Sequence, residues 1–210
     1  MASSEHVGIK AVVFDIGSVL ETIDDSRWPG AWETRLGLEP GGLNLAVADY
    51  DLGGDVMTGE VSEARLRSSW MEIFDLDDAT ADELLRDMWQ WYCGELDDEL
   101  FDYFVALRPH YKTAMLSNSG DGARREEQAR YGFEDVTDLI VYSHEVGMVK
   151  PDPKIFQLTS DRLGVEPNEV VFLDDVEGHV EAARRLGWRA VVHTDTAASI
   201  RAIDQILRHA

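Results

Sequence analysis

Residues 12–20 read Val-Val-Phe-Asp-Ile-Gly-Ser-Val-Leu, and the rest of the chain can be interpreted outward from them. The apolar run is typical of a buried β-strand, and Gly17 predicts a turn directly after it. Asp15 is then expected at the carboxyl edge of a sheet, where open α/β sheets bind their ligands. Taken alone, Asp15 fits an ordinary turn contact as well as it fits a catalytic carboxylate.

Strands and helices alternate through most of the chain. Five apolar segments are predicted as strands, at residues 11–16, 112–116, 138–143, 170–173 and 189–193. Their nearly continuous apolar character is typical of parallel strands buried on both faces. Segments with helical period separate the last four, at residues 123–131, 153–163 and 177–186. The expected fold class is α/β, a Rossmann-like doubly wound parallel sheet with right-handed crossovers.

A long helical segment interrupts this alternation after the first strand. About ninety residues separate the first two predicted strands, with helical patterns at 60–74, 81–93 and 98–108. Such a stretch is too long for a loop. We expect residues 21–97 to form a small inserted α-helical cap, and residues 1–20 and 98–210 to form the α/β core.

Composition narrows the range of partners. The formal net charge of -22 over 210 residues disfavours binding to nucleic acid or to an anionic membrane. No apolar run approaches the roughly 18 residues of a membrane span. Cys93 is the only cysteine, which excludes a disulfide within this chain and favours a cytoplasmic location. A phosphorylated substrate remains compatible, because a bound metal and a lysine reverse the charge locally.

Polar residues also follow the second and third predicted strands. Ser117 and Asn118 precede a helix, where a hydroxyl, an amide and backbone N–H groups form an anion cradle, although Ser-Asn is also a common helix cap. Lys150 is followed by Pro151, which favours extended backbone at the lysine and fixes it at the sheet edge. The alternative for a lone lysine is a solvated surface charge.

Asp174 and Asp175 directly follow the fourth predicted strand. Adjacent carboxylates at a buried edge raise each other's pKa unless they share a cation. Hard oxygen ligands of this kind suit Mg²⁺, whereas a solvated acidic turn is the competing interpretation. Because polar groups of complementary chemistry follow four successive strands, we expect them to form one site rather than four unrelated surface features.

Together, the four motifs resemble those of the haloacid dehalogenase (HAD) superfamily across nearly the whole chain. The closest similarity is to the subfamily with a helical cap after the first motif. The Phe-Asp-Ile-Gly-Ser-Val-Leu and Ser-His-Glu-Val-Gly-Met-Val-Lys-Pro-Asp-Pro segments look like its epoxide-hydrolase-N-terminal-domain-like and sugar-phosphatase branches. The resemblance implies a Mg²⁺-dependent, metal-binding phosphatase. Such a hydrolase cleaves the phosphomonoester of a small phosphorylated metabolite through an aspartyl-phosphate intermediate.

The resemblance also implies a role for each residue of the motifs. Asp15 would be the nucleophile, with Lys150 as the second catalytic residue. Phosphate would be bound by Ser117, Asn118, Lys150, Gly17 and Ser18. Mg²⁺ would be held by Asp15, the carbonyl of Gly17, Asp175 and Asp174, the last either as a ligand or in support.

One position departs from the family pattern. Most phosphatases of the superfamily carry a second Asp as general acid and base where this chain has Gly17. General acid catalysis typically contributes about 10²–10⁴-fold, and Glu21, Asp24 or a cap residue are candidates to replace it. Two alternatives therefore stay open: haloacid dehalogenation through an ester on Asp15, and a non-catalytic protein that binds phosphate or a partner.

The cap sequence is rich in tryptophan. In the family this region faces the active site, so Arg27 and Trp28 are candidates for substrate selection. The alternative is that Trp28 and Trp32, at helical spacing, form the core of the cap. Either a monomer or a homodimer is compatible with the sequence. For His144 and His179 we expect structural roles.

Overall fold

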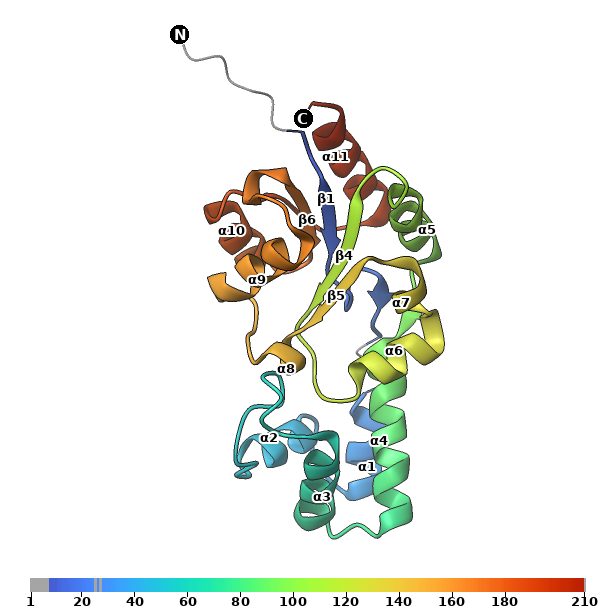
Figure 1. The fold of residues 1–210 in the computed structure, drawn as a ribbon. Helices are drawn as coiled ribbons and strands as arrows, with labels where there is room; N and C mark the ends of the chain where they lie inside the picture. The colour runs from blue at the N-terminus through green and yellow to red at the C-terminus, as the bar shows by residue number, and fades with distance from the viewer. Residues whose placement is uncertain (1–7, 25, 27, 210) are drawn as a thin grey trace.

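The structure, a computed structural model, describes residues 8–24, 26 and 28–209. At its centre lies a five-stranded parallel sheet in the order β5-β4-β1-β6-β7 (Figure 1). Its strands are β1 (Ala11–Phe14), β4 (Lys112–Ser117), β5 (Leu139–Tyr142), β6 (Val170–Asp174) and β7 (Arg189–Val192). The predicted doubly wound α/β fold is confirmed, because the chain builds outward from β1 to one edge and then to the other.

The register of the central strands aligns their carboxyl ends. Phe14 at the end of β1 pairs with Met115 of β4 on one side and with Leu173 of β6 on the other. The residues that follow these strands therefore meet at one edge of the sheet. This alignment makes a site from side chains far apart in sequence.

Helices cover both faces of the sheet, and alternate residues of β1 pack against different layers. Phe14 packs on Phe104, with ring centroids 5.0 Å apart, whereas Val13 belongs to the core on the opposite face. The helices on the Phe14 face are α5 (Asp98–Leu107) and α11 (Thr196–Arg208), and those on the Val13 face are α9 (Pro153–Leu163) and α10 (Glu177–Arg185).

Local sequence signals set the helix ends. The Asp152 carboxylate accepts a hydrogen bond from the Lys154 N–H, Pro153 opens α9, and Gly164 ends it with a φ of 63°. The predicted bounds of α9 and of α6 (Ala123–Tyr131) are met at both ends. Among the helices that pack with the sheet, α7 (Phe133–Val136), α8 (Ser143–Val146), the 3₁₀ helix η1 (Pro167–Glu169) and the longer α11 were not predicted.

The inserted segment is helical and has an apolar core of its own. It contains α1 (Gly30–Leu36), α2 (Gly42–Ala48), α3 (Glu63–Phe74) and α4 (Asp78–Cys93), of which the sequence predicted the last two. Trp28, Trp32 and Trp70 are buried in one cluster with Leu43 and Leu84. Figure 1 shows these helices gathered beyond the carboxyl ends of β4 and β5.

A two-stranded antiparallel sheet joins this segment to the rest of the chain. Its strands are β2 (Glu21–Thr22) and β3 (Glu95–Leu96), and the Asp97 N–H donates to the carbonyl of Leu20. We propose that residues 21–97 are the cap and that this pair is its stem. Across the described residues, no helix is both long and apolar enough to cross a membrane.

Candidate active site

Asp15 follows β1 and is held by backbone hydrogen bonds. Its N–H donates to the carbonyl of Leu173 at 2.8 Å, which extends the pairing with β6 by one residue. Its carboxylate Oδ1 accepts from the N–H of Ile16 at 2.8 Å. The residue is only 7% exposed, so its carboxylate is fixed inside the edge of the sheet.

Lys150 brings two of the motifs together. Its ammonium Nζ lies 2.7 Å from Asp15 Oδ1 and 2.7 Å from Asp174 Oδ2. The backbone of Lys150 is fixed by Asn118, whose Oδ1 accepts from the Lys150 N–H and whose Nδ2 donates to the Lys150 carbonyl. With 3% of its surface exposed, Lys150 is a buried cation between two carboxylates and not a solvated surface charge.

The pKa values of the two carboxylates beside this cation shift in opposite directions. Burial raises the pKa of Asp15 to about 7. The charge of Lys150 lowers this pKa and the nearby Asp174 raises it, but Lys150 does not offset the effect of burial. Burial acts in the same direction on Asp174, but hydrogen bonds from His179 and Lys150, with their charges, hold its pKa well below the ordinary value. Asp15 would therefore be fully ionised at neutral pH only with more positive charge than Lys150 supplies.

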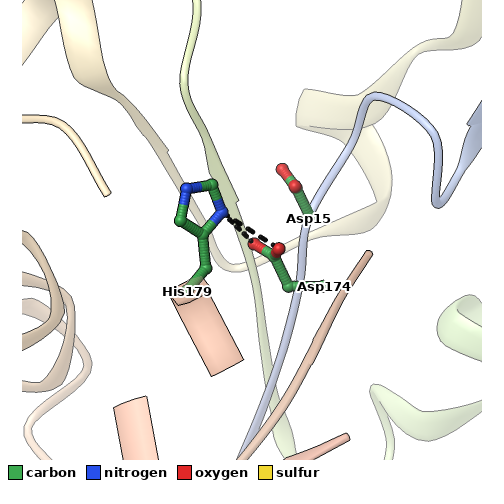
Figure 2. A group of neighbouring side chains, drawn as sticks. All are labelled: Asp15, Asp174 and His179. Carbon is green, nitrogen blue, oxygen red and sulfur yellow. Dashed lines mark hydrogen bonds and ion pairs between the residues drawn. The ribbon is translucent and has the colours of Figure 1, made fainter. Parts of the chain in front are cut away.

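A third side chain completes a cluster that could hold a metal ion. Among the described residues, ligand atoms of Asp15, Asp174 and His179 all lie within 4.8 Å of one another. Figure 2 shows His179 Nδ1 directed at both oxygens of Asp174, at 3.0 and 3.2 Å, with the Asp15 carboxylate beside them. Asp175, predicted as a metal ligand, lies next to this cluster but is not one of its three members.

The predicted phosphate-binding residues differ in their settings. Ser117 is buried, and its side chain lies near the Tyr92 hydroxyl. Ser18 is exposed and has a left-handed φ of 59°. Gly17 has no positive φ, and a Cβ there would lie an ordinary 3.6 Å from Ile23 Cδ1. Neither backbone conformation nor local space therefore requires glycine at the position where the family usually has its acid.

Of the residues considered for substrate selection, Arg27 lies outside the described residues. Trp28 and Trp32 are 8% and 4% exposed and belong to the apolar cluster of the inserted segment. Trp28 stacks on Trp91, with centroids 6.0 Å apart. The packing interpretation of the two tryptophans is therefore confirmed.

Two histidines have more specific contacts than the sequence indicated. His144 Nδ1 lies 2.9 Å from the Ser119 hydroxyl, which places it beside the loop after β4. His179 contacts Asp174 directly. His179 lies five residues after Asp174, and α10 begins between them. The contact between the two side chains therefore depends on the shape of the turn between β6 and α10, which the periodicity of the sequence does not reveal.

A second group of buried carboxyls lies near Asp15. Glu127 of α6 is fully buried and accepts a hydrogen bond from the Tyr142 hydroxyl through Oε2. Glu21 is also fully buried, and neither of its carboxyl oxygens has a hydrogen-bond partner among the described residues. Burial, followed by the charge of Glu127, raises the pKa of Glu21 to about 10. Burial is also the main cause that raises the pKa of Glu127 to about 8.

Comparison with known proteins agrees with this arrangement. The haloacid dehalogenase-like hydrolase family matches residues 9–187, and the chain belongs to that family. A D-ribitol-5-phosphate phosphatase from Bacteroides thetaiotaomicron is 30% identical over 86% of this chain and 89% of its own length. Bifunctional epoxide hydrolase 2 from Sus scrofa is 30% identical over 95% of this chain, which spans only 39% of that protein.

The fold also matches solved structures. A HAD family enzyme from Bacteroides thetaiotaomicron, crystallised with magnesium and inorganic phosphate, has a TM-score of 0.76. The match covers 89% of this chain and 95% of that one at 23% identity, a level that establishes the shared fold alone. The chain is thus a HAD-like hydrolase.

Proposed function

We propose that this hydrolase is a Mg²⁺-dependent phosphatase that acts on a small phosphorylated metabolite of the cytoplasm. The observation that carries the proposal is the buried ammonium of Lys150, 2.7 Å from both Asp15 and Asp174. Such a centre places a carboxylate nucleophile beside a fixed positive charge, which phosphoryl transfer requires. The name of the Bacteroides relative, a phosphatase that covers most of this chain, supports the same reaction class.

In the proposed reaction, a carboxylate oxygen of Asp15 attacks phosphorus while the bond from phosphorus to the alcohol oxygen breaks. The departing alkoxide oxygen takes a proton from water and leaves as the alcohol, and a further water then hydrolyses the aspartyl phosphate, which releases phosphate and restores Asp15. Lys150 stabilises negative charge on the phosphoryl oxygens and on Asp15. Ser117 and Asn118, on the adjacent strand end, would orient the phosphoryl group.

The residues at this centre fit a magnesium ion. The raised pKa of Asp15, caused first by burial, indicates that Lys150 alone leaves the carboxylates undercompensated. Carboxylate oxygens from Asp15 and from Asp174 or Asp175, with the Gly17 carbonyl, are the hard ligands that Mg²⁺ prefers. When bound, the ion would supply additional positive charge for the phosphoryl oxygens. His179, a poorer ligand for Mg²⁺, would hold Asp174 in position instead.

The proposal is tested by phosphate release from para-nitrophenyl phosphate, with Mg²⁺ and with EDTA. Para-nitrophenolate leaves without protonation, so glycine at position 17 does not hide activity. We expect turnover only with Mg²⁺, and a loss of at least about 10³-fold in Asp15→Asn. Asp49→Asn, which changes an exposed carboxylate after α2, is the matched control and should retain wild-type turnover.

Two other outcomes would each contradict the proposal. Metal-independent chloride release from 2-chloropropionate, abolished in Asp15→Asn, would identify a dehalogenase. Mg²⁺ binding by calorimetry without turnover of any phosphomonoester would identify a non-catalytic member of the family.

A further inference from the structure

A cavity of about 280 Å³ lies between the inserted helices and the α/β core. Its wall on the core side is the loop at residues 118–121, which directly follows β4. Its remaining wall comes from residues 56–66, from the loop before α3 and α3 itself, and from residues 88–92 of α4. The cavity therefore adjoins the strand end that carries the predicted phosphate-binding residues.

The wall on the side of the inserted helices is almost entirely apolar or aromatic. The side chains that define it are Val61, Leu66, Met88, Trp89, Trp91 and Tyr92. Such a surface gains free energy when it buries hydrocarbon and offers little to a hydroxyl group. An open hollow of about 520 Å³ between α2 and α3 is lined by Trp28 but by none of the residues predicted for catalysis or for binding phosphate and metal.

Most polar groups in the wall already have partners within the protein. Trp89 Nε1 donates to Glu63 Oε1 at 2.5 Å, and the Glu63 carboxylate also pairs with Arg125. Asp121 Oδ2 accepts from the Glu63 N–H, and the Ser119 hydroxyl contacts His144. A ligand with many hydroxyl groups would have to break these contacts or remain unsatisfied.

One indole in the wall retains a free donor. Trp91 Nε1 is buried and has no hydrogen-bond partner among the described residues. Because this atom is buried, it does not face the open cavity and adds no donor for a chain of hydroxyl groups.

The cavity is connected to the reactive carboxylate through short contacts. Asn118, in its wall, bonds the backbone of Lys150, and the Lys150 ammonium contacts Asp15. Tyr92, also in its wall, lies near the side chain of Ser117. A phosphoryl group at Asp15 would thus have its organic group beside this cavity.

We propose that the cavity binds the organic group of the substrate, and that the substrate is the phosphate monoester of an apolar alcohol and not of a polyol. This inference rests on the proposed phosphatase function. An apolar cavity of about 150 Å³ holds benzene, so this one fits a single ring with substituents or a medium-length alkyl chain. The specificity would differ from that named for the ribitol-phosphate phosphatase of Bacteroides.

The first experiment measures kcat/KM for ethyl, butyl and hexyl phosphate and for ribitol 5-phosphate, with Mg²⁺. Each methylene that enters the cavity should raise kcat/KM by up to about fourfold, so hexyl phosphate should exceed ethyl phosphate by on the order of 100-fold. Ribitol 5-phosphate should fall below butyl phosphate. Turnover that is independent of chain length, or highest for ribitol 5-phosphate, would overturn the inference while the phosphatase proposal stands.

Variants locate the effect in the cavity. Val56 is half-buried in the loop before α3, and its Cγ1 would lie 3.0 Å from a Cβ at Gly120, so Val56→Phe should fill the cavity near that loop. We expect kcat/KM for hexyl phosphate to fall at least about tenfold, with ethyl phosphate within about twofold. Leu45→Phe on α2, where Leu45 is 65% exposed, is the matched control and should leave both unchanged. Equal losses on both substrates in Val56→Phe would contradict the inference.

The affinity of the cavity for alkyl groups can also be measured without turnover. Trp89 and Trp91 line the cavity, so titration with methyl-, butyl- and octylphosphonate should change tryptophan fluorescence. Octylphosphonate should bind at least about tenfold more tightly than butylphosphonate. If no phosphomonoester is hydrolysed but this order holds, the phosphatase proposal fails and the apolar site stands. Octylphosphonate that binds no more tightly than methylphosphonate would overturn the site.

Discussion

Two groups of buried carboxyls lie near the carboxyl edge of the sheet, and their charges are balanced differently. Asp15 and Asp174 share the ammonium of Lys150, and His179 adds a further contact to Asp174. Among the described residues, neither Glu21 nor Glu127 forms a hydrogen bond or ion pair with a lysine or arginine. The charge of Arg130 acts on Glu21, and that of Arg124 on Glu127, only at longer range.

This difference in partners produces a difference in protonation. The pKa of Asp174 lies well below its ordinary value, whereas burial, the largest cause in each case, raises the pKa of Glu127 to about 8 and that of Glu21 to about 10. Asp174 is suited to carry negative charge, Asp15 with its pKa of about 7 is only partly ionised at neutral pH, and Glu21 and Glu127 retain their protons. Burial alone therefore does not decide the state of a carboxyl. Asp174, which His179 contacts as well as Lys150, has a lowered pKa, whereas Asp15 has Lys150 alone and keeps a raised one.

The largest effect is expected from removing that cation. In Lys150→Met, two buried carboxylates lose their common partner and the phosphoryl group loses a fixed positive charge, so kcat should fall by about 10²–10³-fold. Lys112→Met is the control, because Lys112 begins β4 at the other end of the strand and bonds the carbonyl of Leu163. Phosphate release from para-nitrophenyl phosphate measures both, and a Lys150→Met enzyme within threefold of wild type would remove Lys150 from the mechanism.

The second prediction concerns pH and stability at the other group. The folded-state pKa of Glu127 is raised from 4.5 to about 8, so folding favours the protonated form. Its stabilising contribution is complete below the unfolded pKa and is lost as pH rises through the folded value. Between pH 5 and pH 8.5 the contribution of Glu127 to the free energy of unfolding should fall by roughly 4 kcal/mol.

Urea denaturation followed by tryptophan fluorescence at pH 5.5, 7 and 8.5 measures this slope. Glu127→Gln should make it shallower by this amount, because an amide does not titrate, while the part due to the raised pKa of Glu21 remains. Glu181→Gln, on the exposed face of α10, should leave it as in the wild type. Equal slopes in wild type and Glu127→Gln would show that Glu127 ionises freely in the folded protein.

A smaller effect is expected at His179. His179→Ala removes one of the contacts that orient Asp174, and losses of such supporting residues typically cost about 10–100-fold in activity or metal affinity. We expect a loss near the lower end, because Lys150 still holds Asp174. His110→Ala, at an exposed position before β4, is the control. An unchanged kcat and an unchanged Mg²⁺ dependence in His179→Ala would assign this histidine to packing.

Much of the core could be predicted because its signals are local. The strands are short apolar runs, and the glycine and proline residues around α9 fix its ends. The gathering of Asp15, Lys150 and Asp174 was also foreseeable, since the ends of neighbouring parallel strands meet at one edge. The first two helices of the inserted segment were missed because each is only seven residues long and gives no sustained period.

The second carboxyl group could not be predicted for a different reason. Glu126 and Glu127 are adjacent in a highly charged helix, and either one reads as a surface residue. In the structure Glu126 pairs with Arg125 and Arg130, whereas Glu127 faces the sheet and meets Tyr142. Which of two neighbours on a helix is buried depends on how the helix is rotated against the sheet, and this is set by tertiary packing.

Cys93 offers an experimental consequence of where the inserted segment returns to the core. It is the only thiol in the chain, it is fully buried at the end of α4, and burial raises the pKa of its thiol well above the ordinary value. The adjoining Gly94 carbonyl accepts from the Tyr131 hydroxyl of the core at 2.9 Å. A maleimide should therefore modify the native protein only when this junction opens, so the labelling rate reports how often the junction opens.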